Sequence, residues 1–468
     1  MASMRSLKEL AREHARQTPE EKYRQMTEAP VAPLIRSLAA PSIVANLVTA
    51  IYNISDMFFV GMLGTSAAGA IGVAFVAMTA IQAVGFYFGQ GVGNAVSRHL
   101  GAREVEQAKR FVSVGLAITM LAGVVIAVVG NILIEPICVI GGATPTILPY
   151  AETFIGIIFV GAPFMAASLL LNLILRFEGE AFFSMFAMIA GNVLNICLTP
   201  LLMFAFNMGI AGSSISTVVS QLLSFCLLFA EIQRLSPTPV SRKSIRPTKS
   251  IMREINNGGI PSFVRQIMLA VSTTLLNNAA GPYGDAAVAA MAVVQRATSF
   301  ANYIQIGFGQ GFQPVCGFNI GAKNYRRVRE GFFYSMKVST AIVLVIGIFT
   351  SVLAPQVIWL FRADPEVVAD GTLTLRLTSF TIAFTGDALI ANFALQTSGH
   401  MWLATILGAC RLGLVLGPVV VLLSSRLGFF GVQIAQPVSD VITGIIAVPM
   451  VVWLLRDYAR LEKEQQEA

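Results

Sequence analysis

The stretch PSIVANLVTAIYNISD, residues 41–56, combines an apolar pattern with a line of polar groups that ends in a carboxylate. The polar positions are Ser42, Asn46, Thr49, Asn53 and Asp56. Their spacing of three or four residues places them on one face of a helix. A carboxylate inside a membrane-spanning helix costs about 2.5–3.5 kcal/mol and usually faces the bundle interior or a water-filled path. The stretch therefore predicts a membrane-spanning helix with a functional group at Asp56.

The composition predicts a membrane setting for the whole chain. Of its 468 residues, 55% are hydrophobic and 12% are charged, and the mean hydropathy is +0.71. Soluble domains carry about 25% charged residues, so this chain has too little charge to cover a globule in water. The net charge of +7 lies mostly in short loops, where it controls topology, so we expect no nucleic-acid partner.

Stretches long enough to span a membrane recur along the chain. We place twelve of them at about 34–61, 66–97, 108–135, 148–175, 181–207, 209–234, 252–281, 285–318, 328–355, 367–397, 401–426 and 428–456. Lys and Arg gather in alternate connections, which puts both termini in the cytoplasm and requires an even number of spans. The fold class predicted is an all-α polytopic membrane protein.

An internal repeat divides the chain into two homologous halves. Pro41 returns as Pro261 and Ala102 as Ala322, at the same offset, since 261 − 41 = 220 and 322 − 102 = 220. The predicted domains are a cytoplasmic N-terminal tail (1–33), an N-lobe (34–234), a linker (235–250), a C-lobe (251–456) and a cytoplasmic C-terminal tail (457–468). We expect the first 27 residues to form a solvated helical tail. Two parallel six-helix lobes can rock to give alternating access.

Polar residues of the N-lobe converge with Asp56 and Asn53. Asn192, Asn195 and Thr199 share one face of the fifth predicted helix, and Thr217 lies on the sixth. These oxygens could bind a hard cation such as Na+, or form a hydrogen-bonded pocket for a carboxylate that takes up a proton. Both alternatives remain open from the residues alone.

The C-lobe carries four ionisable residues near the middle of the membrane: Arg296, Asp387, Arg411 and Asp440. Each lies about eleven residues, or roughly 16 Å, from a helix end. Two cations and two anions at one depth predict a mutually paired network, and with Gln295 and Asn392 these residues are the candidates for a substrate site or a polar network in the C-lobe. The alternative is that ion pairs such as Arg411 with Asp440 only fix helix packing.

Four motifs resemble those of the multidrug and toxic compound extrusion (MATE) transporters, in the DinF/MepA-like branch. They are Tyr52–Asp56 with Val60 and Gly61, Gly191–Asn195 with Pro200, Gly209–Gly212 with Thr217, Ser220 and Gln221, and Gly309–Pro314 with Gly321 and Ala322. The resemblance covers nearly all of residues 34–456.

This resemblance implies a V-shaped bundle of two six-helix lobes that exports cationic or amphipathic compounds in exchange for H+ or Na+. Asp56 then matches the coupling aspartate, and Asn195 and Thr217 match its partners. Thr199 stands where many members carry a second aspartate, which weakens a Na+ site at Asp56, Asn195 and Thr217 and favours H+. Asp387 matches a carboxylate that another branch uses for coupling or cation recognition.

We therefore expect a secondary-active exporter without a cofactor, acting as a monomer in the plasma (inner) membrane of a prokaryote. The chain lacks the G-K-[ST] ending of a phosphate-binding loop, so an ion gradient must supply the energy. A flippase for a lipid-linked precursor is the alternative, although its cavity should be strongly cationic. A membrane-embedded transferase is more distant, because no nucleophile or metal constellation is visible. We expect no enzymatic activity.

Overall fold

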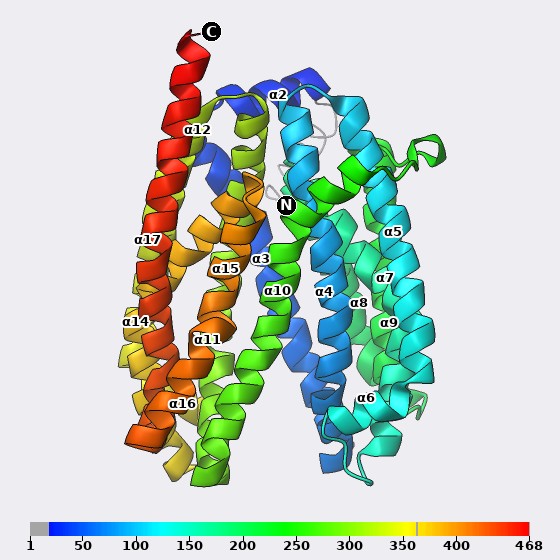
Figure 1. Ribbon diagram of the computed structural model, residues 1–468. Helices are drawn as coiled ribbons and strands as arrows, with labels where there is room; N and C mark the ends of the chain where they lie inside the picture. Colours follow the sequence, from blue (N-terminus) through cyan, green and yellow to red (C-terminus); the bar gives the residue numbers. More distant parts are fainter. Residues whose placement is uncertain (1–17, 362–363, 468) are drawn as a thin grey trace, which may run out of the picture.

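The computed structural model describes residues 18–361 and 364–467, and these residues form helices and loops with no strand (Figure 1). The first half contains α2 (Pro19–Glu28), α3 (Val31–Gly61), α4 (Thr65–Gly101), α5 (Val105–Ile132), α6 (Ile134–Ile140), α7 (Leu148–Phe177), α8 (Ala181–Pro200) and α9 (Ile210–Leu235). The second half contains α10 (Lys249–Ala280), α11 (Asp285–Gly321), α12 (Tyr325–Val352), α13 (Ala354–Phe361), α14 (Pro365–Thr397), α15 (Met401–Ala409), α16 (Leu416–Leu427) and α17 (Phe429–Glu467). Below, N-lobe means α3–α9 and C-lobe means α10–α17.

The helices confirm the predicted fold class. Among the described residues, ten helices are long and apolar enough to cross a membrane, and α14 is an eleventh that bends by 49°. The remaining predicted span is α11, which is 37 residues long but more polar. The predicted span at 401–426 consists of α15, a π turn at Cys410–Leu414 and α16. The last helix continues to Glu467, past its expected end at 456, because a helix can leave the apolar layer and continue with polar residues.

The internal repeat extends to the backbone conformation. Gly64 has a φ of 117° and its counterpart Gly284 a φ of 99°, and each stands immediately before a long helix. Arg103 and Lys323, which are not glycines, also share a positive φ, at 62° and 58°. A matching unusual conformation at the same offset of 220 shows that the two halves use the same local fold.

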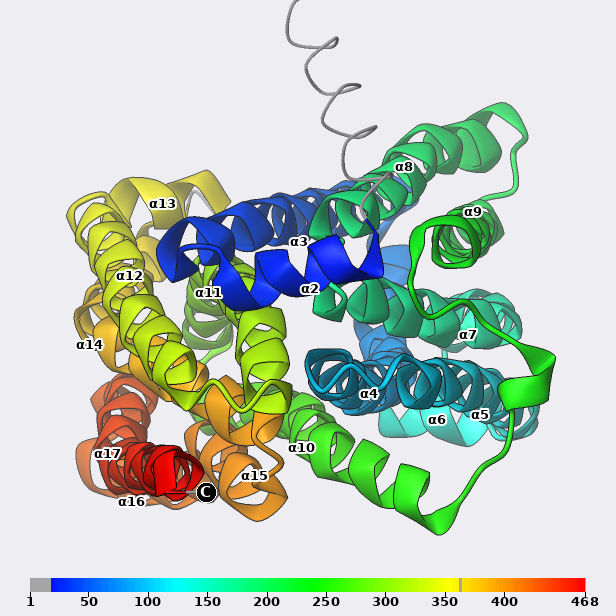
Figure 2. The ribbon, with the colours of Figure 1, turned by 90° about the horizontal axis from the view of Figure 1, so that it is seen from above.

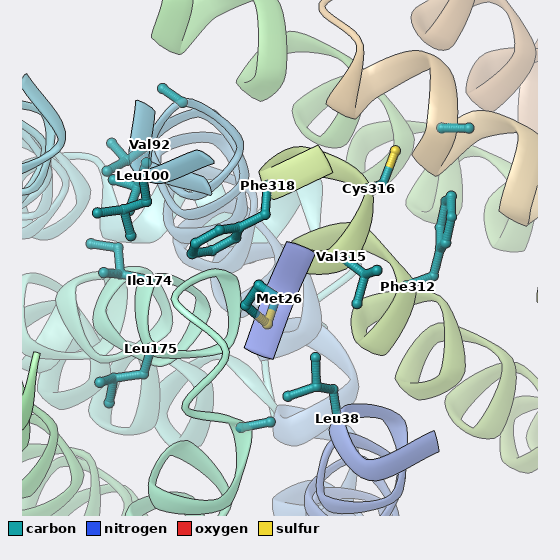
Figure 3. Packing of buried hydrophobic residues seen from close by; sticks show 14 of the residues in the cluster. Met26, Leu38, Val92, Leu100, Ile174, Leu175, Phe312, Val315, Cys316 and Phe318 are labelled. Atoms are coloured by element: carbon teal, nitrogen blue, oxygen red, sulfur yellow. The ribbon is translucent and has the colours of Figure 1, made fainter. Parts of the chain in front are cut away.

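The hydrophobic core is shared between the lobes at one end of the bundle and divided at the other. The shared cluster, which contains Met26, Leu38, Val92, Ile174 and Phe312, draws on both lobes (Figure 3). The other clusters each belong to one lobe. We call the end with the shared core the α2 end, because α2 lies there, and the opposite end the far end (Figure 1). The lobes therefore pack together at the α2 end and separately at the far end.

Glycines bring the two lobes into backbone contact at the α2 end. A Cβ on Gly101 would lie 2.1 Å from the carbonyl oxygen of Phe318, and a Cβ on Gly321 would lie 1.9 Å from the carbonyl oxygen of Arg98. Gly101 and Gly321 are equivalent residues of the repeat, so the contact is reciprocal between α4 and α11. Small residues allow helices to approach this closely, which maximises van der Waals contact between them.

The prediction of a solvated N-terminal tail is wrong for residues 19–28, while residues 1–17 lie outside the described residues. Residues 19–28 form α2, which lies across the α2 end (Figure 2). The Lys22 Nζ atom lies 2.8 Å from Oε1 of Glu180 and also donates to the carbonyl oxygen of Gly179, and Met26 is fully buried. Asn319 of the C-lobe donates to the carbonyl oxygen of Met26. The helix is held in place because the face that carries Lys22 and Met26 contacts residues of both lobes. The polar sequence of this segment gives no indication of these contacts.

Glu178, in the loop between α7 and α8, gives a pH-dependent prediction. Burial raises the pKa of Glu178 to about 7, and the charge of Glu180 adds to this, while hydrogen bonds from Thr238 and Ser236 and the charge of Lys22 act against it. A carboxyl whose pKa is higher in the folded state binds more protons when folded. Its contribution to stability is therefore present below its ordinary pKa, near 4.5, and is lost as the pH rises towards 7.

We expect the Glu178→Gln variant to gain about 1–3 kcal/mol in unfolding free energy relative to wild type when the pH rises from 4.5 to 8. Thermal unfolding in detergent at both pH values measures the difference. Glu106→Gln, which removes an exposed carboxylate, is the control measured at the same two pH values. A Glu178→Gln difference that is equal at both pH values would contradict the prediction.

Candidate functional site

The structure places Asp56 in the far-end half of α3, facing α9. The Ser213 hydroxyl donates a 2.7 Å hydrogen bond to Oδ1 of Asp56, and the aspartate is half-buried. Ser213 was not among the residues predicted for this site. Its signal was available, because Ser213 precedes Thr217 by four residues and so shares its helix face.

Three of the four predicted N-lobe residues on α8 and α9 form one hydrogen-bonded cluster. Asn195 donates from Nδ2 to the hydroxyls of Ser216 and Thr217, at 3.0 and 3.1 Å. Thr199 donates to Oδ1 of Asn195 at 3.2 Å, and its hydroxyl lies 2.5 Å from that of Ser216. All four side chains are buried. The structure therefore brings Asn195, Thr199 and Thr217 together and adds Ser216.

The polar face of α3, residues Ser42, Asn46, Thr49, Asn53 and Asp56, is called the α3 stripe below. Asn192 of α8 donates to the Thr49 hydroxyl at 3.1 Å, so it joins the stripe one turn away from Asn53. Asn46 donates to Oε1 of Gln310 and to the carbonyl oxygen of Tyr303, both at 3.3 Å and both on α11. The stripe thus contacts α8 of its own lobe and α11 of the other.

The predicted C-lobe network forms only in part. The Arg411 Nε donates to Oδ1 of Asp440 at 3.0 Å, and Gln436 donates to the same oxygen. The Asp440 side chain is 1% exposed, and Arg411 lies in the π turn, whose wider backbone presents it to α17. This pair matches the packing alternative, since a buried carboxylate requires a partner.

The other predicted C-lobe residues lie apart from this pair. Asp387 accepts a 2.6 Å hydrogen bond from Thr340 of α12, while Arg296 is exposed and joins no ion pair among the described residues. The prediction that all four charges pair is therefore wrong, because equal depth in the membrane does not make helices face one another. The Gln295 Nε2 is buried without a hydrogen-bond partner in the described part of the chain.

Asn392 serves the packing of the repeat. Its Nδ2 donates to the carbonyl oxygen of Ala404 at 2.5 Å. Its counterpart Asn172 donates to the carbonyl oxygen of Ser184, and 404 − 184 is again 220. The same bond fixes a helix pair in each lobe, so Asn392 does not belong to a C-lobe charge network.

The N-lobe site contains a single carboxylate among neutral oxygens. No group of three or more His, Cys, Asp or Glu side chains within residues 18–361 and 364–467 could hold a metal ion. The site offers hydroxyl and amide oxygens that suit a proton-binding carboxylate or a weakly held hard cation.

Comparison with known proteins identifies the family. The sequence model of the MatE family matches residues 41–201 and again residues 261–422. The chain belongs to the MatE family. The two matches begin 220 residues apart, which agrees with the internal repeat. This MatE protein is a multi-pass membrane transporter and not an enzyme.

Its relatives include proteins described as multidrug export protein MepA. The one from Staphylococcus saprophyticus is 27% identical over 431 residues, which cover 91% of this chain and 94% of the relative. The one from Staphylococcus aureus strain MRSA252 is 27% identical over 436 residues, with 92% and 95% covered.

Solved structures share the fold of this MatE protein. A crystal structure of MATE in complex with MaL6 has a TM-score of 0.89 at 23% identity and covers 95% of this chain and 99% of its own. The outward-facing conformation of a multidrug resistance MATE family transporter of the MOP superfamily also has a TM-score of 0.89 at 23% identity, with 94% and 98% covered. These likenesses confirm the MATE-like two-lobe bundle.

Proposed function

We propose that this protein is a secondary-active multidrug exporter that exchanges cationic or amphipathic compounds for H+ at Asp56. The names of the MepA relatives support export of drugs, and the family match supports transport. Exchange proceeds by alternating access between the two lobes.

One observation carries the choice of H+ over Na+. The oxygens of Asn195, Thr199 and Thr217 are engaged in hydrogen bonds with one another and with Ser216, and none of these bonds includes Asp56. A Na+ ion would need several of these oxygens turned towards it. A proton needs only the carboxylate, which on protonation loses its charge and gains an O–H donor.

We place recognition of the cationic substrate at Asp387. Its carboxylate makes a hydrogen bond with Thr340 but no ion pair with any described side chain, so its negative charge is available to a cation. Asp440 is unsuitable because Arg411 neutralises it.

The orientation follows from the charges at the α2 end. Four basic residues lie there, in or beside the α4–α5 and α11–α12 connections: Arg98, Arg103, Lys323 and Arg327. The positive-inside rule places this end in the cytoplasm of a prokaryotic cell, with both termini. The far end, where the lobes have separate cores, then faces outward. We propose that the protein works as a monomer in the inner membrane.

Purified protein in liposomes tests this function. A fluorescent cationic dye is followed while a pH gradient or a Na+ gradient is imposed separately. We expect transport with the pH gradient alone. Transport driven only by Na+ would show that the Asn195 cluster rearranges around a cation, and no transport with either gradient would favour a lipid-linked precursor as substrate.

A further inference from the structure

Arg176, near the end of α7, is a buried cation that the proposed exchange does not use. Its side chain is among the buried residues, at 3% exposure. Among the described residues its guanidinium contacts no carboxylate; Nε donates to the Ser184 hydroxyl at 3.2 Å, and one terminal nitrogen lies 3.6 Å from the sulfur of Met188. Guanidinium groups stay protonated in proteins. A buried and unpaired charge is costly, so its retention calls for a functional reason.

The remaining contact of Arg176 crosses between the lobes. Its other terminal nitrogen donates to Oε1 of Gln310 on α11. The same oxygen accepts the bond from Asn46 of the α3 stripe. Arg176 therefore stands where the stripe, the N-lobe and the C-lobe meet.

The position of this contact along the stripe matters. Asn46 precedes Asp56 by ten residues, or about 15 Å along α3, in the direction of the α2 end. Beyond it lie the shared hydrophobic core and the amide pair of Gln90 and Gln313, which also crosses between the lobes. A proton that moved from Asp56 towards the α2 end along the α3 stripe would reach the Arg176 guanidinium before it reached this core or the amide pair.

We propose that Arg176 is a fixed positive charge that prevents protons at Asp56 from leaking along the α3 stripe to the α2 end. An arginine in a narrow polar path is an electrostatic barrier to protons and cations. Gln310 holds the guanidinium at the seam only while the lobes are closed there, so the barrier belongs to that conformation. The inference rests on the proposed H+ exchange at Asp56.

Ser184 of the N-lobe fixes the position of the Arg176 guanidinium. Asn172 donates to the Ser184 hydroxyl at 2.6 Å and orients it towards Arg176. In the C-lobe, Gln396 occupies the equivalent position at the offset of 220 and donates to Ser262 and the carbonyl oxygen of Gly258. The repeat keeps a polar residue at both positions but a charge only in the N-lobe, the lobe that contains Asp56.

Proton leak without any drug is the measurement. Proteoliposomes with a trapped pH-sensitive dye receive an acid pulse, with valinomycin and K+ to prevent a membrane potential. We expect Arg176→Gln to dissipate the pH gradient about tenfold faster than wild type, because a unit charge beside the path in a site of low dielectric raises the barrier for a proton by roughly the 1.4 kcal/mol that corresponds to this factor. Arg176→Lys keeps the charge and should stay near the wild-type rate. A wild-type rate in Arg176→Gln would overturn the proposal.

Two variants separate a barrier on this path from general damage. Arg265→Gln removes another intramembrane guanidinium, which lies within the C-lobe with its Cζ atom 5.3 Å from the ring centre of Phe393. It should leak at the wild-type rate, and an equal leak would overturn the assignment to Arg176. The double variant Asp56→Asn with Arg176→Gln should return to the wild-type rate, since the route begins at Asp56; a persistent leak would contradict that route.

A further variant covers the case in which Arg176→Gln does not fold. Gln310→Glu keeps Arg176 and places a carboxylate against it, which neutralises the local charge while the side chain keeps its size. It should dissipate the pH gradient as fast as Arg176→Gln is expected to, and a wild-type rate would overturn the proposal. Dye transport by wild type in the same vesicles tests the H+ exchange separately, so failure of either conclusion can be recognised.

Discussion

The Asp56→Asn variant should lose efflux driven by a pH gradient, down to the passive rate of protein-free vesicles, while it remains folded. The amide has the shape of the carboxyl group, and its oxygen can still accept the bond from Ser213, so the packing of α3 against α9 survives. It cannot take up or release a proton, and the exchange then has no driving ion. Dye transport in proteoliposomes measures the loss, and size-exclusion chromatography with thermal unfolding checks the fold.

Asp387→Asn is the matched control, because it makes the same change in the other lobe. The two carboxylates are each half-buried and each accept one hydroxyl hydrogen bond, from Ser213 and Thr340 respectively. We expect Asp387→Asn to weaken the apparent affinity for cationic dyes but to keep the dependence on the pH gradient. Undiminished gradient-driven efflux in Asp56→Asn would falsify the role of Asp56, and loss of pH dependence in Asp387→Asn would move coupling to the C-lobe.

The Gly321→Val variant should fold but fail to close the α2 end. A Cβ at this position would lie 1.9 Å from the carbonyl oxygen of Arg98, across the interface between the lobes. The lobes can relieve the overlap by separating, since the contact is between them and not within either. Overpacking costs about 1–3 kcal/mol, which lowers the equilibrium constant for closing the α2 end by roughly 5- to 150-fold. Transport should fall by a similar factor, because every cycle passes through that state.

Spin labels at Glu106 and Glu330 measure this opening, in a background without the five native cysteines. Both positions are exposed, at the α2 end of different lobes, and we expect a longer distance in Gly321→Val. Gly61→Val is the control, since a Cβ there meets no atom within 4 Å, and it should keep the wild-type distance. An unchanged distance in Gly321→Val, with normal transport, would show that the backbone contact does not control closure.

Several features of this protein could be predicted from the sequence because their signals are one-dimensional. Runs of apolar residues have the length of a bilayer, and the structure confirms helices in the predicted stretches. The repeat is a fixed offset of 220, which the two family matches confirm. The periodicity that placed Asp56, Thr49 and Asn46 on one face is a property of a single helix.

The predicted C-lobe network shows where such signals end. Depth within the membrane can be read from the position along a helix, and Arg411 and Asp440 do meet. Which neighbour a helix faces depends on how whole helices rotate and pack, so the sequence could not show that Arg296 would be exposed or that Thr340 would contact Asp387. Ser213 could have been identified from its helix face alone, whereas its hydrogen bond with Asp56 could not.

The sequence by itself determined the class of protein, the two halves and the main candidate at Asp56, since hydropathy, repetition and helical period need no knowledge of neighbours. Only the tertiary structure decided how the lobes meet. Lys22 reaches Glu180, Gly321 touches the backbone of Arg98, and Arg176 joins Gln310 because chain folding brings distant residues together. The physical reason is that close packing between helices depends on the shapes of both surfaces at once, and a single linear pattern specifies only one of them.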